Sequence, residues 1–319
     1  MSGLSLPRVS VVIPAFNAEQ TLAATIASVQ SQSLSDWDLV VVDDGSRDGT
    51  ADLVRRLMAQ DRRLQLIVSA NKGVSAARNL GVARSHGPVV AFLDADDLWR
   101  ADKLERHLDH LSRMPEVGVS FARVQFLTPA GESSGQLSRA RLRNLEAEHF
   151  LAENPTTTTS NWVVRRRVLD EAGGFCEEMS YCEDLEWLLR VRCCTGWAIE
   201  GLNTVLTSYR TSVGGLSADL ERMEAGWETM LAKARTYAPE LVRRHEDRAR
   251  AIHLRYLARR SLRLGSASAQ GVDFMARALR SDPGLLLRQP RRTWPTWGAV
   301  QLRRWRNRAR SAVAGGGQP

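Results

Sequence analysis

The sequence contains few cysteines and no long apolar run. Four cysteines occur in 319 residues, and their spacings fit no common zinc pattern; they are Cys176, Cys182, Cys193 and Cys194. Reduced thiols are the favoured interpretation, and a metal site is the weaker alternative. No stretch of about eighteen apolar residues occurs, and the first residues lack a secretory-signal pattern. We therefore expect a cytoplasmic protein with no membrane-spanning helix.

Three common motifs of nucleotide-binding proteins and hydrolases are also absent. The chain has no G-x-x-x-x-G-K-[ST] sequence, no G-x-G-x-x-G after its first predicted strand, and no G-x-S-x-G. These absences disfavour a P-loop enzyme, a dinucleotide-binding fold and an α/β-hydrolase. If the protein binds a nucleoside diphosphate, a metal ion and basic side chains must balance its charge.

Charge is divided unevenly along the chain, whose formal net charge is +8. From Leu220 onward there are 21 Lys and Arg residues against 8 Asp and Glu, whereas the first 219 residues hold 23 against 28. A mildly acidic body therefore precedes a basic tail, and we expect the two regions to have different roles.

Apolar runs alternate with helical patterns in the first hundred residues. We predict strands at 10–14, 39–42, 64–68 and 89–93. The predicted helices are residues 18–30 with Asn17 as cap, a helix from about Thr50, and one carrying Arg78. Continuous apolar strands separated by helices are typical of a mostly parallel sheet covered on both faces, which is the α/β class. A further strand is predicted at 116–121 and a helix at 185–191.

Two of these strands end in carboxylates. Asp43 and Asp44 follow the second strand, and Asp94, Asp96 and Asp97 follow the fourth. Ligands of open α/β sheets bind at the carboxyl ends of the strands, and Asp94 and Asp96 can converge on one hard cation that also binds phosphate. One acid, Asp96 or Asp97, is expected to cap the following helix.

Four sequence blocks together resemble the family-2 glycosyltransferases with a GT-A fold. They are Val-Val-Ile-Pro-Ala-Phe-Asn (11–17), Val-Val-Asp-Asp-Gly-Ser (41–46), Asn-Lys-Gly-Val-Ser-Ala-Ala-Arg-Asn (71–79) and Phe-Leu-Asp-Ala-Asp-Asp-Leu-Trp (92–99). The four occur in order, each at a strand end or in the turn after it. The resemblance implies a GT-A domain at 1–219, with a nucleotide-binding half at 1–100 and an acceptor-binding, catalytic half at 101–219. The remaining residues, 220–319, form a basic helical extension.

The resemblance also implies a nucleotide and metal site. Asp94 and Asp96 correspond to the family's DXD motif, which contacts ribose and ligates Mg²⁺ or Mn²⁺ on the diphosphate of a nucleotide-sugar, usually a UDP-sugar. The residues expected at the nucleotide are Pro14, Ala15, Phe16, Asn17, Asp43, Asp44, Asn71, Arg78, Asp94 and Ala95.

A second acidic site is expected further along the chain. Gly173-Gly174-Phe175 resembles the Gly-Gly-Phe that precedes the family's catalytic acid, and the Glu-Asp pair follows at Glu183 and Asp184. The resemblance makes Asp184 the base that deprotonates an acceptor hydroxyl during inverting transfer, with Glu183 beside it. Considered alone, the two acids are better explained as an exposed helix N-terminus, where the helix dipole favours them, and the four matched blocks turn the interpretation to catalysis. The polar loop 154–160 could line an acceptor site or be a plain surface loop.

The chain departs from the family at one motif. Many members have Tyr-Arg-x-His, whereas this sequence has Tyr209-Arg210-Thr211-Ser212. Arg210 is therefore a candidate diphosphate contact in place of the missing His.

The basic tail reads as three helices, 221–237, 241–264 and 269–280, followed by the segment 285–310. That last segment places Trp294, Trp297 and Trp305 among arginines, a composition that suits an anionic membrane surface. A solvated helical cap is the alternative, and no nucleic-acid partner is expected.

The sequence thus predicts a metal-dependent, inverting glycosyltransferase of bacterial cell-surface polysaccharide or lipopolysaccharide synthesis. Its acceptor would be a carbohydrate or a lipid-linked sugar, and the protein would lie on the cytoplasmic face of the inner membrane. A non-catalytic nucleotide-sugar binder or membrane adaptor on the same scaffold is the alternative. A nucleotidyltransferase is less favoured, because residues 14–17 do not form a Gly-rich basic loop.

Overall fold

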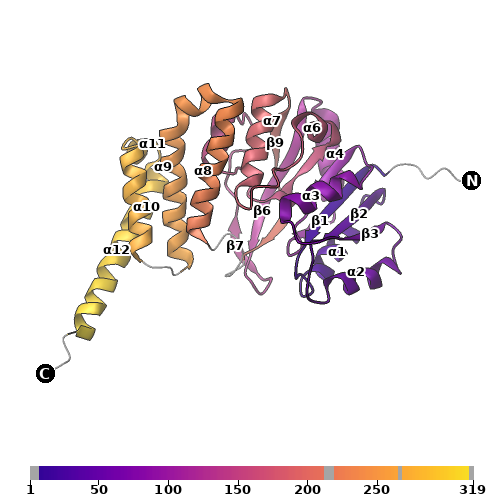
Figure 1. Ribbon diagram of the computed structural model, residues 1–319, viewed down its shortest axis with the longest axis horizontal. Coiled ribbons are helices and arrows are strands. Elements are labelled where there is room, and N and C mark those ends of the chain that lie inside the picture. Colours follow the sequence, from indigo (N-terminus) through magenta and orange to yellow (C-terminus); the bar gives the residue numbers. More distant parts are fainter. Residues whose placement is uncertain (1–6, 212–218, 265–267, 316–319) are drawn as a thin grey trace, which may run out of the picture. The chain divides into compact units, whose positions relative to one another are not determined.

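The computed structural model describes residues 7–211, 219–264 and 268–315 (Figure 1). The chain divides into two compact units: Met1–Ala147 with Asn154–Ser212, and Glu148–Glu153 with Val213–Pro319. No helix in the described ranges is both long and apolar enough to cross a membrane.

The first unit is built on one mixed sheet. Its strands are β1 (Val9–Ala15), β2 (Trp37–Asp43), β3 (Leu64–Val68), β4 (Val89–Phe92), β5 (Leu98–Trp99), β6 (Val117–Leu127), β7 (Ser133–Leu137), β8 (Val163–Arg165) and β9 (Ala198–Arg210). The order is β3-β2-β1-β4-β8-β6-β9-β5, with β7 beside β6. Strands β1 to β4 are mutually parallel, and β8 is antiparallel to both β4 and β6. The carboxyl ends of β1, β2 and β4 therefore lie at the same end of the sheet.

Helices cover both faces of this sheet (Figure 1). The helices of the first unit are α1 (Leu22–Gln30), α2 (Thr50–Met58), α3 (Val74–Ala83), α4 (Lys103–Arg113), η1 (Thr159–Asn161), α6 (Arg166–Ala172) and α7 (Glu183–Cys194), and α5 (Ala147–Ala152) lies where the chain passes between units. Successive side chains of a strand point to opposite faces. Leu39 and Val41 pack with Ile26 of α1, whereas Val40 and Val42 pack with Ala77 of α3.

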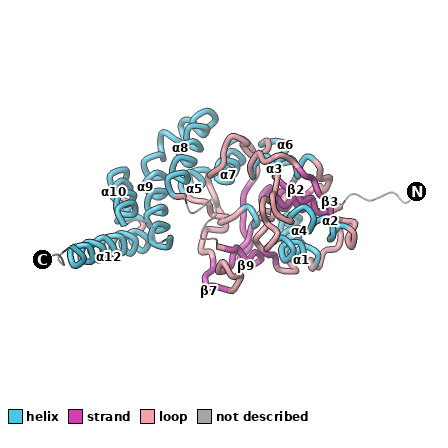
Figure 2. Tube along the Cα trace, turned by 60° about the horizontal axis from the view of Figure 1, so that its bottom comes forward, coloured by secondary structure: helices cyan, strands magenta, loops and turns pink. Residues whose placement is uncertain are grey.

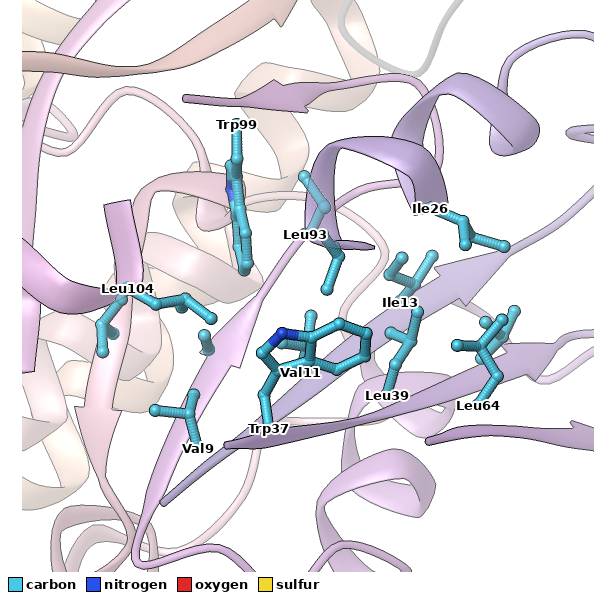
Figure 3. Packing of buried hydrophobic residues seen from close by; sticks show 14 of the residues in the cluster. Val9, Val11, Ile13, Ile26, Trp37, Leu39, Leu64, Leu93, Trp99 and Leu104 are labelled. Atoms are coloured by element: carbon cyan, nitrogen blue, oxygen red, sulfur yellow. The ribbon is translucent and has the colours of Figure 1, made fainter. Parts of the chain in front are cut away.

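The larger core layer is shown in Figure 3. Alternate residues of β1, which are Val9, Val11 and Ile13, point into it together with Trp99 and Leu104. All five side chains are at most 6% exposed. Strands β1 and β4 each pair with a neighbour on both sides, and this apolar layer packs against them, so their carboxyl ends are held in place.

The second unit is helical in its described residues (Figure 2). Its helices are α8 (Leu220–Tyr237), α9 (Pro239–Leu264), α10 (Ser268–Ser281), α11 (Leu285–Arg288) and α12 (Pro290–Gly315). Its core includes Leu257, Phe274 and Val300. Residues 148–153 belong to this unit because Trp227 Nε1 donates to Leu151 O at 2.8 Å and the carboxylate of Glu153 pairs with Arg255 and Arg292.

The α/β class predicted from the sequence is confirmed, and the four predicted N-terminal strands correspond to β1 to β4. Strands β5, β7, β8 and β9 were not predicted. Strands β5 and β8 have only two and three residues, β7 is exposed throughout, and the apolar positions of β9 are interrupted by polar residues such as the buried Thr207. The predicted segment 285–310 is divided into α11 and α12. The four cysteines form no disulfide with one another.

Two predicted caps are wrong. Helix α1 begins at Leu22 rather than Ala18, and Asn17 instead adopts a left-handed conformation with φ of 49°. Neither Asp96 nor Asp97 caps a helix, because α4 begins only at Lys103. The amide oxygen of Asn17 instead accepts from Arg47 N, and the carboxylate of Asp97 accepts from Arg210 N of β9.

Gly81 of α3 allows that helix to approach β1 closely. A Cβ at this position would lie 2.3 Å from Val12 Cγ1, a stiff β-branched side chain in the core. We expect Gly81→Ala to destabilise the protein by about 1–3 kcal/mol through overpacking, despite the better helix propensity of Ala. The measurement is the urea midpoint followed by circular dichroism.

The matched control is Gly298→Ala in α12, where a Cβ would meet nothing within 4 Å. This change should leave the midpoint unchanged or raise it. Equal midpoints for the two variants would contradict the packing argument.

Candidate functional site

The acids at the end of β2 organise the loops around them. Asp43 Oδ1 accepts from Ser46 N at 2.9 Å, and the two carboxylate oxygens of Asp44 accept from Lys72 N and Gly73 N, each at 2.8 Å. Both aspartates are almost fully buried. Asp44 therefore ties the loop after β3, which contains the exposed Asn71, to the end of β2.

The end of β1 joins the same cluster of loops. Pro14 and Ala15 are buried within the strand, and Ala15 O accepts from Asp44 N at 2.8 Å. Asn17 N donates to the Ser46 hydroxyl at 2.9 Å, and Asn17 Oδ1 accepts from Arg47 N at 2.8 Å. Phe16, between them, is half-exposed. The predicted nucleotide residues of β1 and β2 are thus brought together, with one aromatic ring open to solvent.

Three carboxylates are crowded after β4. Burial and the charge of Asp94 raise the pKa of Asp96 to about 6. Burial, followed by the charges of Asp96 and Asp94, raises the pKa of Asp97 well above its usual value. Asp97 Oδ1 accepts from Arg210 N at 2.8 Å, while its buried Oδ2 has no hydrogen-bond partner among the described residues. Negative charge is concentrated here with few groups to balance it.

Arg210 supports this acidic turn from β9. Its Nε donates to Asp96 O at 3.1 Å and its Nη1 donates to Pro129 O at 3.1 Å. The structure therefore gives Arg210 a role in holding the turn, and its contact with a diphosphate stays a prediction. Ser212, which replaces the family's His, lies outside the described residues.

Arg78 joins the two acidic regions predicted from the sequence. Its Nη2 lies 2.8 Å from Asp94 Oδ1 and its Nη1 lies 2.9 Å from Glu183 Oε1. The arginine side chain is only 4% exposed, whereas those of Asp94 and Glu183 are 28% and 12% exposed, so the guanidinium side of each pair is shielded from water. Burial acts against the charge, but the carboxylates of Asp94 and Glu183 raise the pKa of Arg78. Arg78 thus positions carboxylates, and its guanidinium does not extend into solvent.

Asp184 lies beside this bridge in the first turn of α7. Its Oδ1 accepts from Leu185 N at 2.7 Å and its Oδ2 accepts from Asn154 Nδ2 at 2.6 Å. Burial raises the pKa of Asp184, while these two donors and Arg78 act in the opposite direction. Glu183 also has a raised pKa, first through burial and then through the charge of Asp184. The two acids are not an exposed helix end.

The loop 154–161 also contributes to the site, although sequence reasoning assigned it no definite role. Besides the contact of Asn154 with Asp184, Ser160 Oγ accepts from Asp94 N at 2.9 Å and Thr158 Oγ1 donates to Asp94 Oδ2 at 3.3 Å. The only sequence signal was a polar run without helical period. Nothing in that run indicates that its side chains are buried against two carboxylates.

The acidic turn is suited to a divalent cation that brings other ligands with it. Among the described residues, no three His, Cys, Asp or Glu side chains converge on one metal position. Carboxylate oxygens of Asp94 and Asp96 are the ligands that Mg²⁺ and Mn²⁺ prefer, and such ions often take their remaining ligands from phosphates and water. The donor set therefore fits an ion held between the protein and a diphosphate.

Curated proteins with similar sequences are glycosyltransferases. The chain is 41% identical over 106 residues to the putative teichuronic acid biosynthesis glycosyltransferase TuaG of Bacillus subtilis, covering 33% of this chain and 42% of that protein. It is 40% identical over 114 residues to the Escherichia coli UDP-Glc:α-D-GlcNAc-diphosphoundecaprenol β-1,3-glucosyltransferase WfgD, covering 35% and 43%. The chain thus spans less than half the length of these relatives.

Solved structures show the same fold. Staphylococcus aureus TarS 1–349 in complex with UDP-GlcNAc superposes with a TM-score of 0.61 and 16% identity, covering 94% of this chain and 92% of that chain. The mannosyltransferase PcManGT of Pyrobaculum calidifontis, in complex with GDP-Man and Mn²⁺, also gives a TM-score of 0.61, with 23% identity and coverage of 93% and 85%. The architecture is that of GT-A glycosyltransferases.

The family model described as glycosyl transferase family 2 matches residues 10–173. The match contains the acidic ends of β2 and β4, Arg78 and the loop 154–161, and it covers more than half of the chain. The protein belongs to glycosyl transferase family 2.

Proposed function

We propose that the protein is an inverting glycosyltransferase. It would move a sugar from a nucleotide-sugar, specifically a UDP-sugar, to a hydroxyl group of an acceptor. The bridge made by Arg78 carries this proposal. One buried guanidinium holds Asp94, which belongs to the acidic turn after β4, and Glu183, the neighbour of Asp184. Asp94, on the proposed leaving-group side, and Asp184, on the proposed acceptor side, therefore belong to one site.

Asp94 and Asp96 would hold the metal ion on the leaving-group side. When bound, Mg²⁺ or Mn²⁺ stabilises the charge that develops on a leaving diphosphate. The crowded carboxylates support this assignment, and the similarly folded PcManGT was solved with GDP-Man and Mn²⁺. The loops tied together by Asp43 and Asp44 would receive the nucleoside, with Phe16 available to contact it.

Asp184 would act as the base. In an inverting transfer the acceptor oxygen attacks from the side opposite the diphosphate, and its proton must leave as the bond forms. Glu183 is already paired with Arg78, whereas the donors to Asp184 are neutral N–H groups, so its remaining lone pairs can accept a proton. A pKa raised by burial suits a base that works near neutral pH.

We also propose an acceptor from bacterial cell-surface polysaccharide synthesis, either a carbohydrate or a lipid-linked sugar. The support is the similarity to TuaG, a putative teichuronic acid biosynthesis glycosyltransferase, and to WfgD, which acts on a sugar-diphosphate lipid. Because a lipid-linked acceptor is anchored in a membrane, we propose the cytoplasmic face of the inner membrane as the location.

Helix α12 would provide contact with an anionic membrane surface. Trp294, Trp297 and Trp305 lie on one side of a 3.6-residue helix and are each at least 39% exposed. A neighbouring side of α12 is buried, at Thr293, Thr296 and Val300. Exposed indoles among arginines favour the headgroup region of anionic lipids.

A non-catalytic nucleotide-sugar binder or membrane adaptor on this scaffold is the alternative function. It would bind UDP and turn over no donor, even with Asp184 intact. A nucleotidyltransferase is less well supported, because no Gly-rich basic loop follows β1.

Asp184→Asn should lower kcat by about 100-fold or more, because it removes the base and keeps the shape of the side chain. The assay is hydrolysis and transfer over a panel of UDP-, GDP- and dTDP-sugars with Mn²⁺. Asp170→Asn, at an exposed position on α6, is the matched control and should retain full activity. Tight UDP binding without turnover of any donor by the parent would favour the binder.

Asp96→Ala should remove the Mn²⁺-dependent part of UDP affinity, because one of the two proposed carboxylate ligands of the ion is lost. The negative charge of Asp94 remains and has no second carboxylate ligand to share the ion with. Titration calorimetry with UDP, in Mn²⁺ and in EDTA, measures this difference. Asp52→Ala, at an exposed carboxylate of α2, serves as control. An unchanged Mn²⁺ effect in Asp96→Ala would reject the metal role of Asp96.

Replacing Trp294, Trp297 and Trp305 together by Gln should weaken binding to phosphatidylglycerol vesicles by at least about tenfold, since three indoles no longer reach the lipid. Co-sedimentation at low salt measures this binding. Leu137→Gln, which removes an exposed apolar side chain of β7, is the control. Parental binding by the triple variant would exclude α12 as the contact.

A further inference from the structure

Asn154 is held in one orientation by the loop that follows it. Its Oδ1 accepts from Thr156 N at 2.8 Å and from Thr156 Oγ1 at 2.6 Å. Because both groups are donors, the oxygen of the amide must face Thr156 and the NH₂ group must face the other way, toward Asp184. A reversed amide would place its oxygen against the carboxylate oxygen 2.6 Å away.

Thr156 is in turn anchored in the core. It is fully buried, and its Oγ1 accepts from Trp162 Nε1 at 2.6 Å. The ring of Trp162 packs against those of Phe175 and Trp187, with centroids 6.0 and 5.3 Å away, and those two rings also contact each other at 5.6 Å. Asn161 Nδ2 also donates to Thr156 O at 3.0 Å. The amide of Asn154 is therefore supported by a rigid aromatic layer.

The same loop adopts an unusual backbone conformation between its two contacts. Thr157 has a φ of 77°, which is rare for a β-branched residue. It separates Asn154, which holds Asp184, from Thr158, which holds Asp94. Such conformations persist where the surrounding structure imposes them, and they concentrate at functional sites.

We propose that Asn154 is a positioning residue, which orients the carboxylate of Asp184 and stabilises its ionised, proton-accepting form. The inference rests on the proposed role of Asp184 as base. Asn154 Nδ2 and Leu185 N occupy one lone pair on each carboxylate oxygen, so the plane of the group is fixed and two lone pairs remain for an acceptor proton.

The charged groups around Asp184 oppose one another. Arg78 of α3 favours the ionised carboxylate, whereas the charge of Asp94 after β4 disfavours it. Glu183 and the half-buried Cys182 are its titratable neighbours in the chain. Asn154 adds a neutral donor to the ionised form, so its loss should raise the pKa of Asp184.

Two variants distinguish the loss of the hydrogen-bond donor to Asp184 from the loss of the contact that holds the loop. Asn154→Ala removes the whole amide, whereas Asn154→Asp keeps an oxygen that can accept from Thr156 and replaces only the donor. Carboxyl carbon NMR of the full chain, labelled at aspartate, follows the titration of Asp184, and its signal is assigned by its absence in Asp184→Asn. We expect the midpoint to rise by about one pH unit in Asn154→Ala and further in Asn154→Asp, which adds a negative charge.

Asn203→Ala, at an exposed position of β9 where the side chain accepts from Arg123, is the control and should titrate like the parent. With a donor from the panel, kcat of Asn154→Ala should fall by about tenfold or more while UDP affinity is unchanged. Parental midpoints in both Asn154 variants would overturn the inference. Full transfer activity in Asp184→Asn would instead reject the proposed base and leave the orientation by Asn154 intact.

Discussion

The site depends on one buried guanidinium. Arg78 reaches from α3 to Asp94 and to Glu183, which are otherwise carried by separate parts of the sheet domain. Without this cation, two carboxylates would face each other with little solvent, and removing one partner of such a buried pair typically costs about 3–5 kcal/mol. The side chain of Arg78 therefore couples the conformation of the turn after β4 directly to that of the start of α7.

Around that bridge, buried acids act mainly as acceptors for backbone N–H groups. Asp43 and Asp44 each hold a loop, and Asp97 holds the end of β9 through Arg210 N. Carboxylates used in this way tie irregular loops to the ends of strands, since each accepts hydrogen bonds from backbone N–H groups that no strand or helix satisfies. The parallel strands of an apolar core supply the fixed ends from which these loops start, so a polar site can be built at the edge of a hydrophobic sheet.

The loop 154–161 is the second element that contacts both acidic regions of the site. Its polar side chains contact Asp94 at one end and Asp184 at the other, and it is anchored to the aromatic layer by Trp162. A short segment thus sets both the leaving-group side and the acceptor side of the proposed reaction. The helical unit is organised around its own apolar core, and some of its arginines are paired with acids, as Arg255 is with Glu153.

The sequence by itself determined the α/β class, strands β1 to β4, and the acids that end β2 and β4, because these depend on short-range apolar patterns. Only the tertiary structure decided which polar groups meet. Arg78 and Glu183 are 105 residues apart and Asn154 and Asp184 are 30 apart, so no local period relates them. Asn17 and Asp97 were wrongly expected to cap helices for the same physical reason: a polar side chain bonds to whichever donor or acceptor the completed fold brings within reach.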